Sequence, residues 1–298
     1  MIYHLLAFLT VTIWGSTFVF TKMLLQNGLS PAHIFTLRFA IAYFLLVIVE
    51  LAKWARRQGA APRFLSATLH DELMMVGLGV SGGSLYFLTE NAALLYTTAT
   101  NTSLIVCSCP LFAALLIGMV YRSERFNRAQ LLGSLLACVG MAIVVLNGHF
   151  VLHLSPLGDL LAFSACLCWA VYSLLMIPIG HRYDTVFITR KVFFYGLLTM
   201  IPYYLLVPGF PPLALLLQPD VIANLLFLGC IASLLCFLVW TWLIKKLGAV
   251  ITTNYVYINP IATILFAWWL LGEQITLYFL LGSAMILVGM YLCERQRR

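Results

Sequence analysis

Two charged residues, Arg38 and Glu90, lie inside long apolar stretches of the sequence. A charge in the hydrocarbon core of a membrane is costly, and such residues usually have a partner or a function. If the two stretches cross a membrane in opposite directions, both charges lie toward the same face, and this depth permits an ion pair between them. Three interpretations stay open: a structural ion pair, a Glu90 carboxylate that carries a proton or faces the amine of a bound solute, and side chains that reach the membrane surface.

One motif is typical of an enzyme. The run Gly79–Gly82 matches the Gly-x-Ser-Gly motif of intramembrane serine proteases. Such a protease needs a histidine base that faces the serine at the same depth. The histidines that follow Ser81 fall in expected loops (His149, His153 and His181). We therefore expect no catalytic residues and no enzyme, and we interpret the small residues around Ser81 as a close-packing patch.

The cysteines do not indicate a metal or disulfide site. All eight fall inside or at the end of apolar runs, and no spacing among them is typical of a disulfide framework or a zinc site. No Walker loop for ATP is present. We expect no metal and no cofactor.

The composition predicts a membrane protein. The chain is 63% hydrophobic and 9% charged, and its mean hydropathy is +1.00, whereas roughly a quarter of the residues of a soluble domain are charged. The net charge of +7 could suggest a nucleic-acid partner. The basic residues lie at the ends of apolar runs, however, as in membrane proteins. We therefore expect the protein to contact membrane lipid and to bind no nucleic acid.

Apolar runs of spanning length predict ten transmembrane helices, since these runs are too long and too uniformly apolar for the strands of a barrel. The first run shows no features of a cleaved signal and is expected to be the first transmembrane helix. The expected helices cover residues 3–23, 32–51, 73–95, 98–121, 129–147, 157–178, 187–207, 221–243, 249–271 and 277–293.

The distribution of lysine and arginine predicts the orientation. If the N-terminus is cytoplasmic, every lysine and arginine except Lys22 and Arg38 falls in a cytoplasmic segment, and Arg190 and Lys191 are counted there. This bias follows the positive-inside rule and predicts that both termini are cytoplasmic.

The second half of the sequence repeats the first. Because five helices per half is an odd number, the copies must cross the membrane in opposite senses, which is the architecture of many transporters. The fold is therefore expected to be all-α, with one repeat at 1–148 and an inverted repeat at 149–298. Glu124 and Glu273 lie near expected helix N-termini, where a carboxylate is stabilised, so we interpret them as structural. The matching pairs are Pro110 and Pro260, Glu124 and Glu273, Gly133 and Gly282, and Gly140 and Gly289.

Pro110 and Pro260 interrupt the expected fourth and ninth helices at matched places. A proline removes a backbone donor, so the carbonyls of Val106 and Val256 are expected to lose their helical partners. The prolines either kink the helices for packing or act as hinges for opening and closing.

Aromatic and amide side chains predict a binding site at the membrane midplane. Trp14 and Trp169 occupy matching positions about halfway along the first and sixth expected helices, too deep for an interfacial belt. A solute site needs apolar ring surface and a few fixed polar groups, and a buried asparagine is costly without a partner. The other candidates are Tyr86, Tyr172, Tyr255, Tyr257, Asn101, Asn254 and Asn259.

These motifs together resemble the drug/metabolite transporter superfamily, EamA type. The resemblance covers 3–293 and includes Trp14-Gly-Ser, Leu37-Arg38-Phe39 and the repeated Pro…Glu…Gly-x6-Gly pattern. The sequence departs from the pattern after Trp169, where Ala-Val replaces Gly-Ser. The resemblance implies a ten-helix, inverted-repeat secondary carrier, and bacterial relatives are mostly exporters of amino acids and related metabolites. By resemblance, the residues that line the substrate cavity would include Trp14, Tyr86, Asn101, Trp169, Trp240 and Tyr255.

The sequence thus favours a multi-pass protein of the bacterial inner membrane that exports an amino acid or a similar small metabolite by alternating access. Its partners would be the small-molecule substrate, lipid and, if transport is coupled, a proton at Glu90. The alternative is an uptake or exchange carrier for a larger, nucleoside-like or drug-like solute. A receptor or structural protein would show no solute flux.

Overall fold

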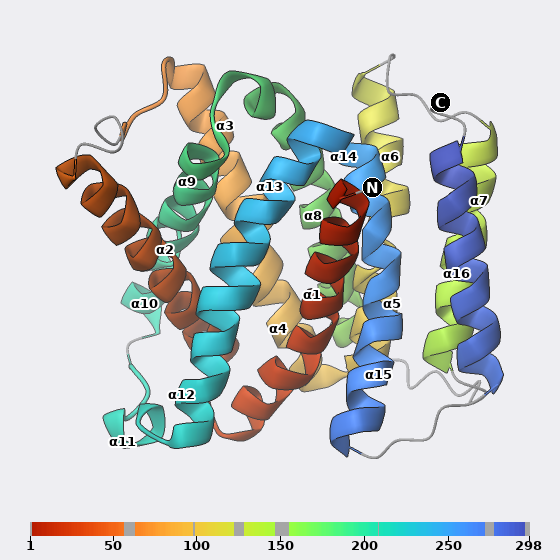
Figure 1. Ribbon diagram of the computed structural model, residues 1–298. Coiled ribbons are helices and arrows are strands. Elements are labelled where there is room, and N and C mark those ends of the chain that lie inside the picture. Colours follow the sequence, from red (N-terminus) through yellow and green to blue (C-terminus); the bar gives the residue numbers. More distant parts are fainter. Residues whose placement is uncertain are drawn as a thin grey trace.

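The computed structural model describes residues 2–56, 63–97, 99–121, 128–146, 155–207, 209–271 and 277–295. All regular structure in these ranges is helical. The chain folds as a bundle (Figure 1). Each apolar run predicted from the sequence falls on a helix or on consecutive helical segments. Glu124 and Glu273, two residues of the predicted repeat, lie outside the described residues.

The helical segments before residue 150 are, in chain order, α1 (Ile2–Gln26), α2 (Pro31–Ala55), α3 (Leu69–Gly79), η1 (Val80–Ser84), α4 (Leu85–Tyr96), α5 (Ala99–Val106), α6 (Cys109–Val120) and α7 (Arg128–Leu146). Those that follow are α8 (Pro156–Arg182), α9 (Thr185–Leu198), α10 (Ile201–Leu206), α11 (Leu213–Leu216), α12 (Pro219–Leu226), η3 (Phe227–Leu235), α13 (Cys236–Leu247), α14 (Ala249–Asn254), η4 (Tyr255–Ile258), α15 (Asn259–Leu271) and α16 (Leu277–Arg295).

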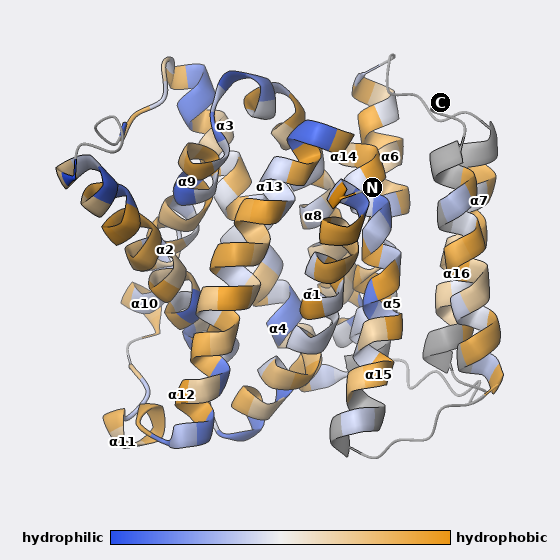
Figure 2. Ribbon diagram, in the orientation of Figure 1, coloured by the Kyte–Doolittle hydropathy of each residue, from blue (hydrophilic) through white to orange (hydrophobic). Residues whose placement is uncertain are grey.

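Several helices have the length and the apolar outer surface of membrane-spanning segments. Large apolar side chains such as Phe44, Met119 and Leu206 are exposed on their outer faces. In Figure 2, hydrophobic residues cover most of the helix surfaces, and hydrophilic residues gather mainly at helix ends. Within the described residues, five helical stretches are long and apolar enough to cross a membrane: Ile2–Gln26, Pro31–Ala55, Pro156–Arg182, Pro219–Leu247 and Ala249–Phe266.

Polar residues fix where several helices begin. The Ser30 side chain accepts a hydrogen bond from the backbone N–H of His33, just before α2. Asp184 accepts one from the backbone N–H of Phe187 at the start of α9. Both satisfy donors that a helix N-terminus leaves without partners.

One end of the bundle carries many of the positive charges. Here α1 begins, α2 ends and α13 ends (Figure 1). We call it the basic end, defined by Lys53, Arg182, Lys245 and Lys246.

Two segments form the wider turns of a π-helix, which the sequence did not predict. One is η1, between α3 and α4, where Gly83 has the non-helical angles φ −128° and ψ −106°. The other is η3, between α12 and α13. The spacing of the repeat places the counterpart of η1 inside η3. Such turns interrupt the regular backbone ladder and often occur at functional sites.

The helix around Pro110 is interrupted as the sequence predicts. Helix α5 ends at Val106, two residues form a turn, and α6 begins at Cys109 with Pro110 in its first turn. Proline fits there because the first turn of a helix needs no intrahelical donor.

The helix around Pro260 is interrupted differently. The segment η4 is a 3₁₀ turn, and Pro260 follows in the first turn of α15. The backbone N–H of Asn259 donates to the carbonyl of Val256. The expectation that this carbonyl lacks a helical partner is therefore wrong, because the tighter turn moves a different donor onto it.

Glycines bring α7 and α16 into close contact at the edge of the bundle (Figure 1). A Cβ atom on Gly140 would lie 2.7 Å from the carbonyl oxygen of Gly282. A Cβ atom on Gly289 would lie 2.5 Å from the carbonyl oxygen of Gly133. Gly140 of α7 thus contacts Gly282 of α16, and Gly289 of α16 contacts Gly133 of α7. At both points the backbones of the two helices lie in direct contact, which side chains larger than glycine would prevent.

Candidate functional site

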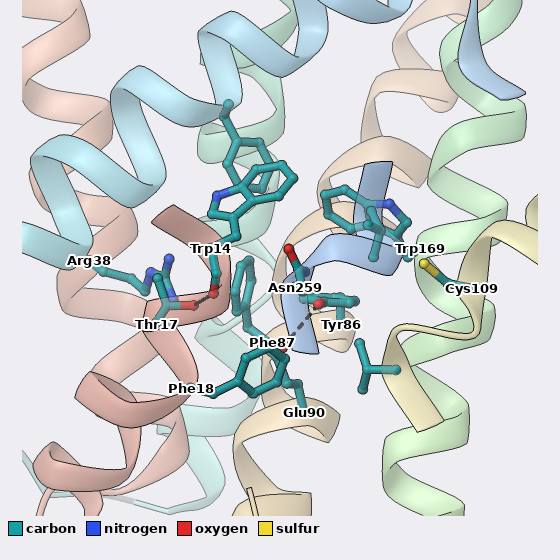
Figure 3. A pocket seen from close by; sticks show the side chains of 13 residues that line it. Trp14, Thr17, Phe18, Arg38, Tyr86, Phe87, Glu90, Cys109, Trp169 and Asn259 are labelled. Carbon is teal, nitrogen blue, oxygen red and sulfur yellow. Dashed lines mark hydrogen bonds between the residues drawn. The ribbon is translucent and has the colours of Figure 1, made fainter. Parts of the chain in front are cut away.

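A cavity in the middle of the bundle contains about 450 Å³ of atom-free space, open solvent included. Figure 3 shows it between α1, α2, α4 and α8, with Asn259 reaching in from α15. Its wall is made by Trp14, Thr17, Phe18, Arg38, Tyr86, Phe87, Glu90, Val106, Cys109, Trp169, Phe237, Val256 and Asn259.

Glu90 presents a carboxylate to this cavity. The phenol of Tyr86, one turn earlier on α4, donates a hydrogen bond of 3.0 Å to Glu90 Oε1. The dashed line between the two side chains in Figure 3 marks this bond. Glu90 is buried, at 8% exposure, and Tyr86 is the hydrogen-bond donor that the described residues supply to its carboxylate.

Arg38 reaches the same cavity from α2. Its Nε donates a hydrogen bond of 2.9 Å to Ser233 Oγ in η3, and its guanidinium carbon lies 4.5 Å from the centre of the Phe87 ring. Within the described residues, Arg38 and Glu90 make no ion pair with each other. The ion pair considered from the sequence is thus not formed, although both charges line one cavity.

The tryptophans and Asn259 bring polar atoms to the cavity. Trp14 Nε1 donates to the carbonyl of Ala232 in η3, at 2.9 Å. Trp169 Nε1 and Asn259 Oδ1 have no partner within the described structure. A buried polar atom without a partner is costly, and both atoms belong to residues that line the cavity.

Other predicted site residues lie beside the cavity. Trp240 packs on Trp14, with ring centres 4.8 Å apart, and Tyr172 packs on Trp169 at 5.1 Å. Both rings are fully buried. We call Trp14, Trp169, Tyr172, Trp240 and Phe237 the aromatic cluster.

Tyr255 and Asn101 complete the predicted set. The Tyr255 hydroxyl is 2.6 Å from His4 Nδ1, a hydrogen bond that places it beside the first turn of α1 and not at the cavity wall. Asn101 belongs to α5, and its side chain lies outside the described part of the chain.

Residues 1–146 and 156–294 each match the EamA-like transporter family. The chain belongs to this family. It is a multi-pass membrane protein, and members of the family transport small molecules.

Several full-length relatives of this EamA-like transporter are named as transporters. An uncharacterized transporter of Archaeoglobus fulgidus is 31% identical over 97% of this chain and 96% of its own length. A probable terminal-alkyne amino-acid exporter of Streptantibioticus cattleyicolor is 26% identical, covering 97% and 92%. A probable amino-acid metabolite efflux pump of Salmonella typhimurium is also 26% identical, covering 96% and 93%.

A solved crystal structure has the same fold. It superposes with a TM-score of 0.73 and covers 99% of each chain, at 18% sequence identity. At that identity, the similarity concerns the fold alone.

In the part of the chain that the structure describes, three ion pairs connect the two family-matched parts of this EamA-like transporter near the basic end. Each joins a carboxylate from α2 or α3 to a cation from α8 or α9. The sequence predicts a cytoplasmic segment for Arg190 and Lys191. Both residues belong to helix α9, and their side chains are buried against neighbouring helices. The pairs are Glu50–Arg190 at 2.6 Å, Asp71–Arg182 at 2.5 Å and Glu72–Lys191. We call these the interhalf ion pairs.

Glu72 is the most highly bonded of these carboxylates. It accepts hydrogen bonds from Lys191 Nζ, the Tyr195 hydroxyl and the backbone N–H of Ser66. Burial raises the pKa of the Glu72 carboxyl, but the bonds from Lys191, Ser66 and Tyr195 outweigh it and lower the pKa to about 2. Glu72 is therefore ionised throughout the physiological pH range.

A larger cavity, with about 920 Å³ of atom-free space, lies near the basic end between α8 and the turn from α13 to α14. The amine of Lys245 at its wall donates to the carbonyl of Tyr183. Because this wall lacks a second charge of opposite sign within the described residues, we favour the central cavity as the solute site.

Sequence reasoning missed Ser233, Ala232 and His4. A serine or alanine in an apolar helix is ordinarily a packing residue, so no local signal predicts that η3 would meet Arg38 and Trp14. His4 could have been noticed as a polar residue within the first apolar run.

Proposed function

We propose that this protein is a secondary active transporter that exports amino acids or related small metabolites across the bacterial inner membrane. The observation that carries the proposal is the central cavity, where a buried cation and a buried carboxylate line one space walled by tryptophans. The names of two relatives support an amino-acid-like solute.

We further propose ten membrane-spanning helices in two inverted repeats, 1–148 and 149–298, with both termini in the cytoplasm. The separate family matches to 1–146 and 156–294 support this division. The reciprocal glycine contacts of α7 and α16 and the matched positions of η1 and η3 support it as well.

Transport by alternating access would require the halves to separate first at one end and then at the other. Trp14, Trp169 and Phe237 of the aromatic cluster wall the central cavity, and the interhalf ion pairs lie near the basic end. They support a conformation closed toward that end, in which the ion pairs must break before the solute site opens there.

Counterflow in proteoliposomes tests the function. The purified full chain would be reconstituted with a mixture of the twenty amino acids inside, and exchange with labelled external solutes would be followed by mass spectrometry. Exchange of one class of amino acid supports the proposal. If no amino acid exchanges but a nucleoside-like or drug-like solute does, the alternative of a carrier for larger metabolites replaces it.

Pro110→Ala and Pro260→Ala test the hinge. If the prolines are hinges, each change restores a backbone donor and lets the segments on either side join into a stiffer, continuous helix, and the counterflow rate is expected to fall about tenfold, equivalent to about 1.4 kcal/mol in barrier height. Substrate affinity should change little. Pro212→Ala, in the segment before α11, serves as the control. Unaltered rates in both helix variants would leave the prolines only a packing role.

Glu90→Gln tests proton coupling. The variant keeps the shape of the side chain and removes its charge, so any dependence of transport on an imposed pH gradient should disappear, while counterflow at equal pH remains detectable at a reduced rate. The groups that face Glu90 are Arg38, Tyr86, Cys107 and Cys109. A variant that follows the pH gradient as the wild type does would exclude Glu90 as the proton carrier.

A further inference from the structure

Arg38 is a buried cation with unused donors. Its exposure is 2%, and its Nε is bonded to Ser233. The two terminal nitrogens have no hydrogen-bond partner within the described residues. A guanidinium presents its terminal N–H groups as a planar fork that matches a carboxylate. Because Arg38 lines the central cavity, the fork is available to a solute there.

The surroundings of Arg38 hold the fork without neutralising it. Ser233 fixes one edge of the guanidinium, and the Phe87 ring lies against its face. Neither contact supplies a negative charge. A buried charge without a directly paired counter-charge is strongly unfavourable, and an anionic ligand would relieve this cost.

The negative charge at the cavity belongs to Glu90, which makes no ion pair with Arg38 within the described residues. Glu90 is oriented by Tyr86, and Figure 3 shows Glu90 and Arg38 approaching the cavity from different helices. Opposite charges that line one cavity without pairing with each other can each bind one of the two charges of a zwitterionic solute. The walls between them are largely apolar, with Trp14, Trp169 and Phe237 among them.

We propose that Arg38 binds the carboxylate of a zwitterionic amino acid whose amine lies against Glu90, and that Ser233 is the positioning residue for Arg38. This inference rests on the proposed function, since it names the substrate class of the same cavity. The carboxylate accepts two parallel N–H bonds from the fork. The amine donates to the carboxylate of Glu90, and the side chain of the solute packs among the aromatic rings.

The role of Ser233 follows from its place in η3. The wider turns of this segment bring the Ser233 hydroxyl to Arg38 and the Ala232 carbonyl to Trp14. Loss of the Ser233 hydroxyl would free Nε and let the fork rotate. It would therefore weaken carboxylate binding without removing the charge.

Equilibrium binding tests the subsite independently of transport. The purified full chain would be heated with each of the twenty amino acids and, separately, with the corresponding amino-acid amides, which keep the amine and lack the carboxylate. A bound ligand raises the melting temperature. We expect at least one amino acid to bind about 10- to 100-fold more tightly than its amide, as loss of a charge-assisted hydrogen-bonded contact implies.

Three variants separate the subsite from a structural role of Arg38. In Arg38→Gln the preference for the acid over the amide should disappear. In Arg38→Lys part of it should remain, because a point charge replaces the fork. In Ser233→Ala the affinity for the acid should fall several-fold, with little change for the amide. Glu90→Gln is the matched comparison, because it should weaken acid and amide together.

The outcomes are distinct. An amide that binds the wild type as tightly as the acid, no binding of any amino acid, or an Arg38→Gln protein that folds and keeps the preference would each overturn the inference. The wild-type comparison needs no variant to fold. Binding of an amino acid without counterflow would refute the transport function and leave the subsite standing, whereas equal counterflow of acids and amides would do the reverse.

Discussion

Replacing Gly289 with leucine is expected to lower the melting temperature of the purified protein by roughly 5 °C or more. A Cβ atom at this position would lie 2.5 Å from the Gly133 carbonyl oxygen and 2.7 Å from the Ala137 backbone nitrogen. Backbone atoms cannot rotate away, so α16 must move off α7. Overpacking of this kind costs about 1–3 kcal/mol or more, which corresponds to several degrees for a protein of this size.

Thermal unfolding in detergent, followed by circular dichroism, measures this effect. Val288→Leu is the matched control, because Val288 lies on the same turn of α16 with 51% of its surface exposed, and it should leave the melting temperature within about 1 °C. Gly140→Leu should repeat the result, since its Cβ atom would meet the Gly282 carbonyl oxygen at 2.7 Å. If Gly289→Leu and Gly140→Leu both left the melting temperature unchanged, α7 and α16 could move apart without loss of stability, and the prediction would be wrong.

Glu72→Gln is expected to destabilise the protein by about 3 kcal/mol at pH 7, because it leaves the buried amine of Lys191 without its counter-charge. The pKa of Glu72 in the folded protein is about 2, below the ordinary value of 4.5. A lowered pKa means that the carboxylate contributes its full stability above pH 4.5 and loses it as the pH falls toward 2. The difference between wild type and variant should therefore be constant from pH 7 to 5 and shrink below that.

Melting temperatures of the wild type and the Glu72→Gln variant, measured at pH 7, 5, 4 and 3, test this predicted pH dependence. The double variant Glu72→Gln/Lys191→Met is the control, because removing both charges should recover much of the lost stability. A variant that is as stable as the wild type at pH 7, or a difference that grows as the pH falls, would contradict the assignment of Glu72 as a stabilising carboxylate.

The helices and part of the site could be predicted because their signals are local. Long apolar runs identify helices wherever they occur, and Arg38 and Glu90 are conspicuous in such runs. The repeat identified Trp14 and Trp169 as matching residues, and both line the cavity. These inferences need composition and spacing, and they do not depend on how the helices rotate against one another.

The contacts that depend on rotation could not be predicted. A π-turn changes which face of a helix points inward, so the sequence could not indicate that Ser233 meets Arg38. The same limit applies to Trp240 and Tyr255, which the resemblance placed at the cavity and which lie beside it or near the start of α1. The burial of Lys191 could not be predicted from the sequence for a different reason. A lysine near a helix end ordinarily faces water, and its partner Glu72 is distant in sequence.

The interhalf ion pairs also determine which halves can associate. In all three, the carboxylate belongs to the first family match, residues 1–146, and the cation to the second, residues 156–294. If the halves are inverted repeats, two copies of the first half placed together would carry the carboxylates of the second copy at the opposite end. The carboxylates at this end would then have no counter-charge, and two copies of the second half would leave its cations alone in the same way. A buried charge that loses its partner costs about 3–5 kcal/mol. The halves are thus specialised as unlike partners, and joining them in one polypeptide guarantees equal numbers of each.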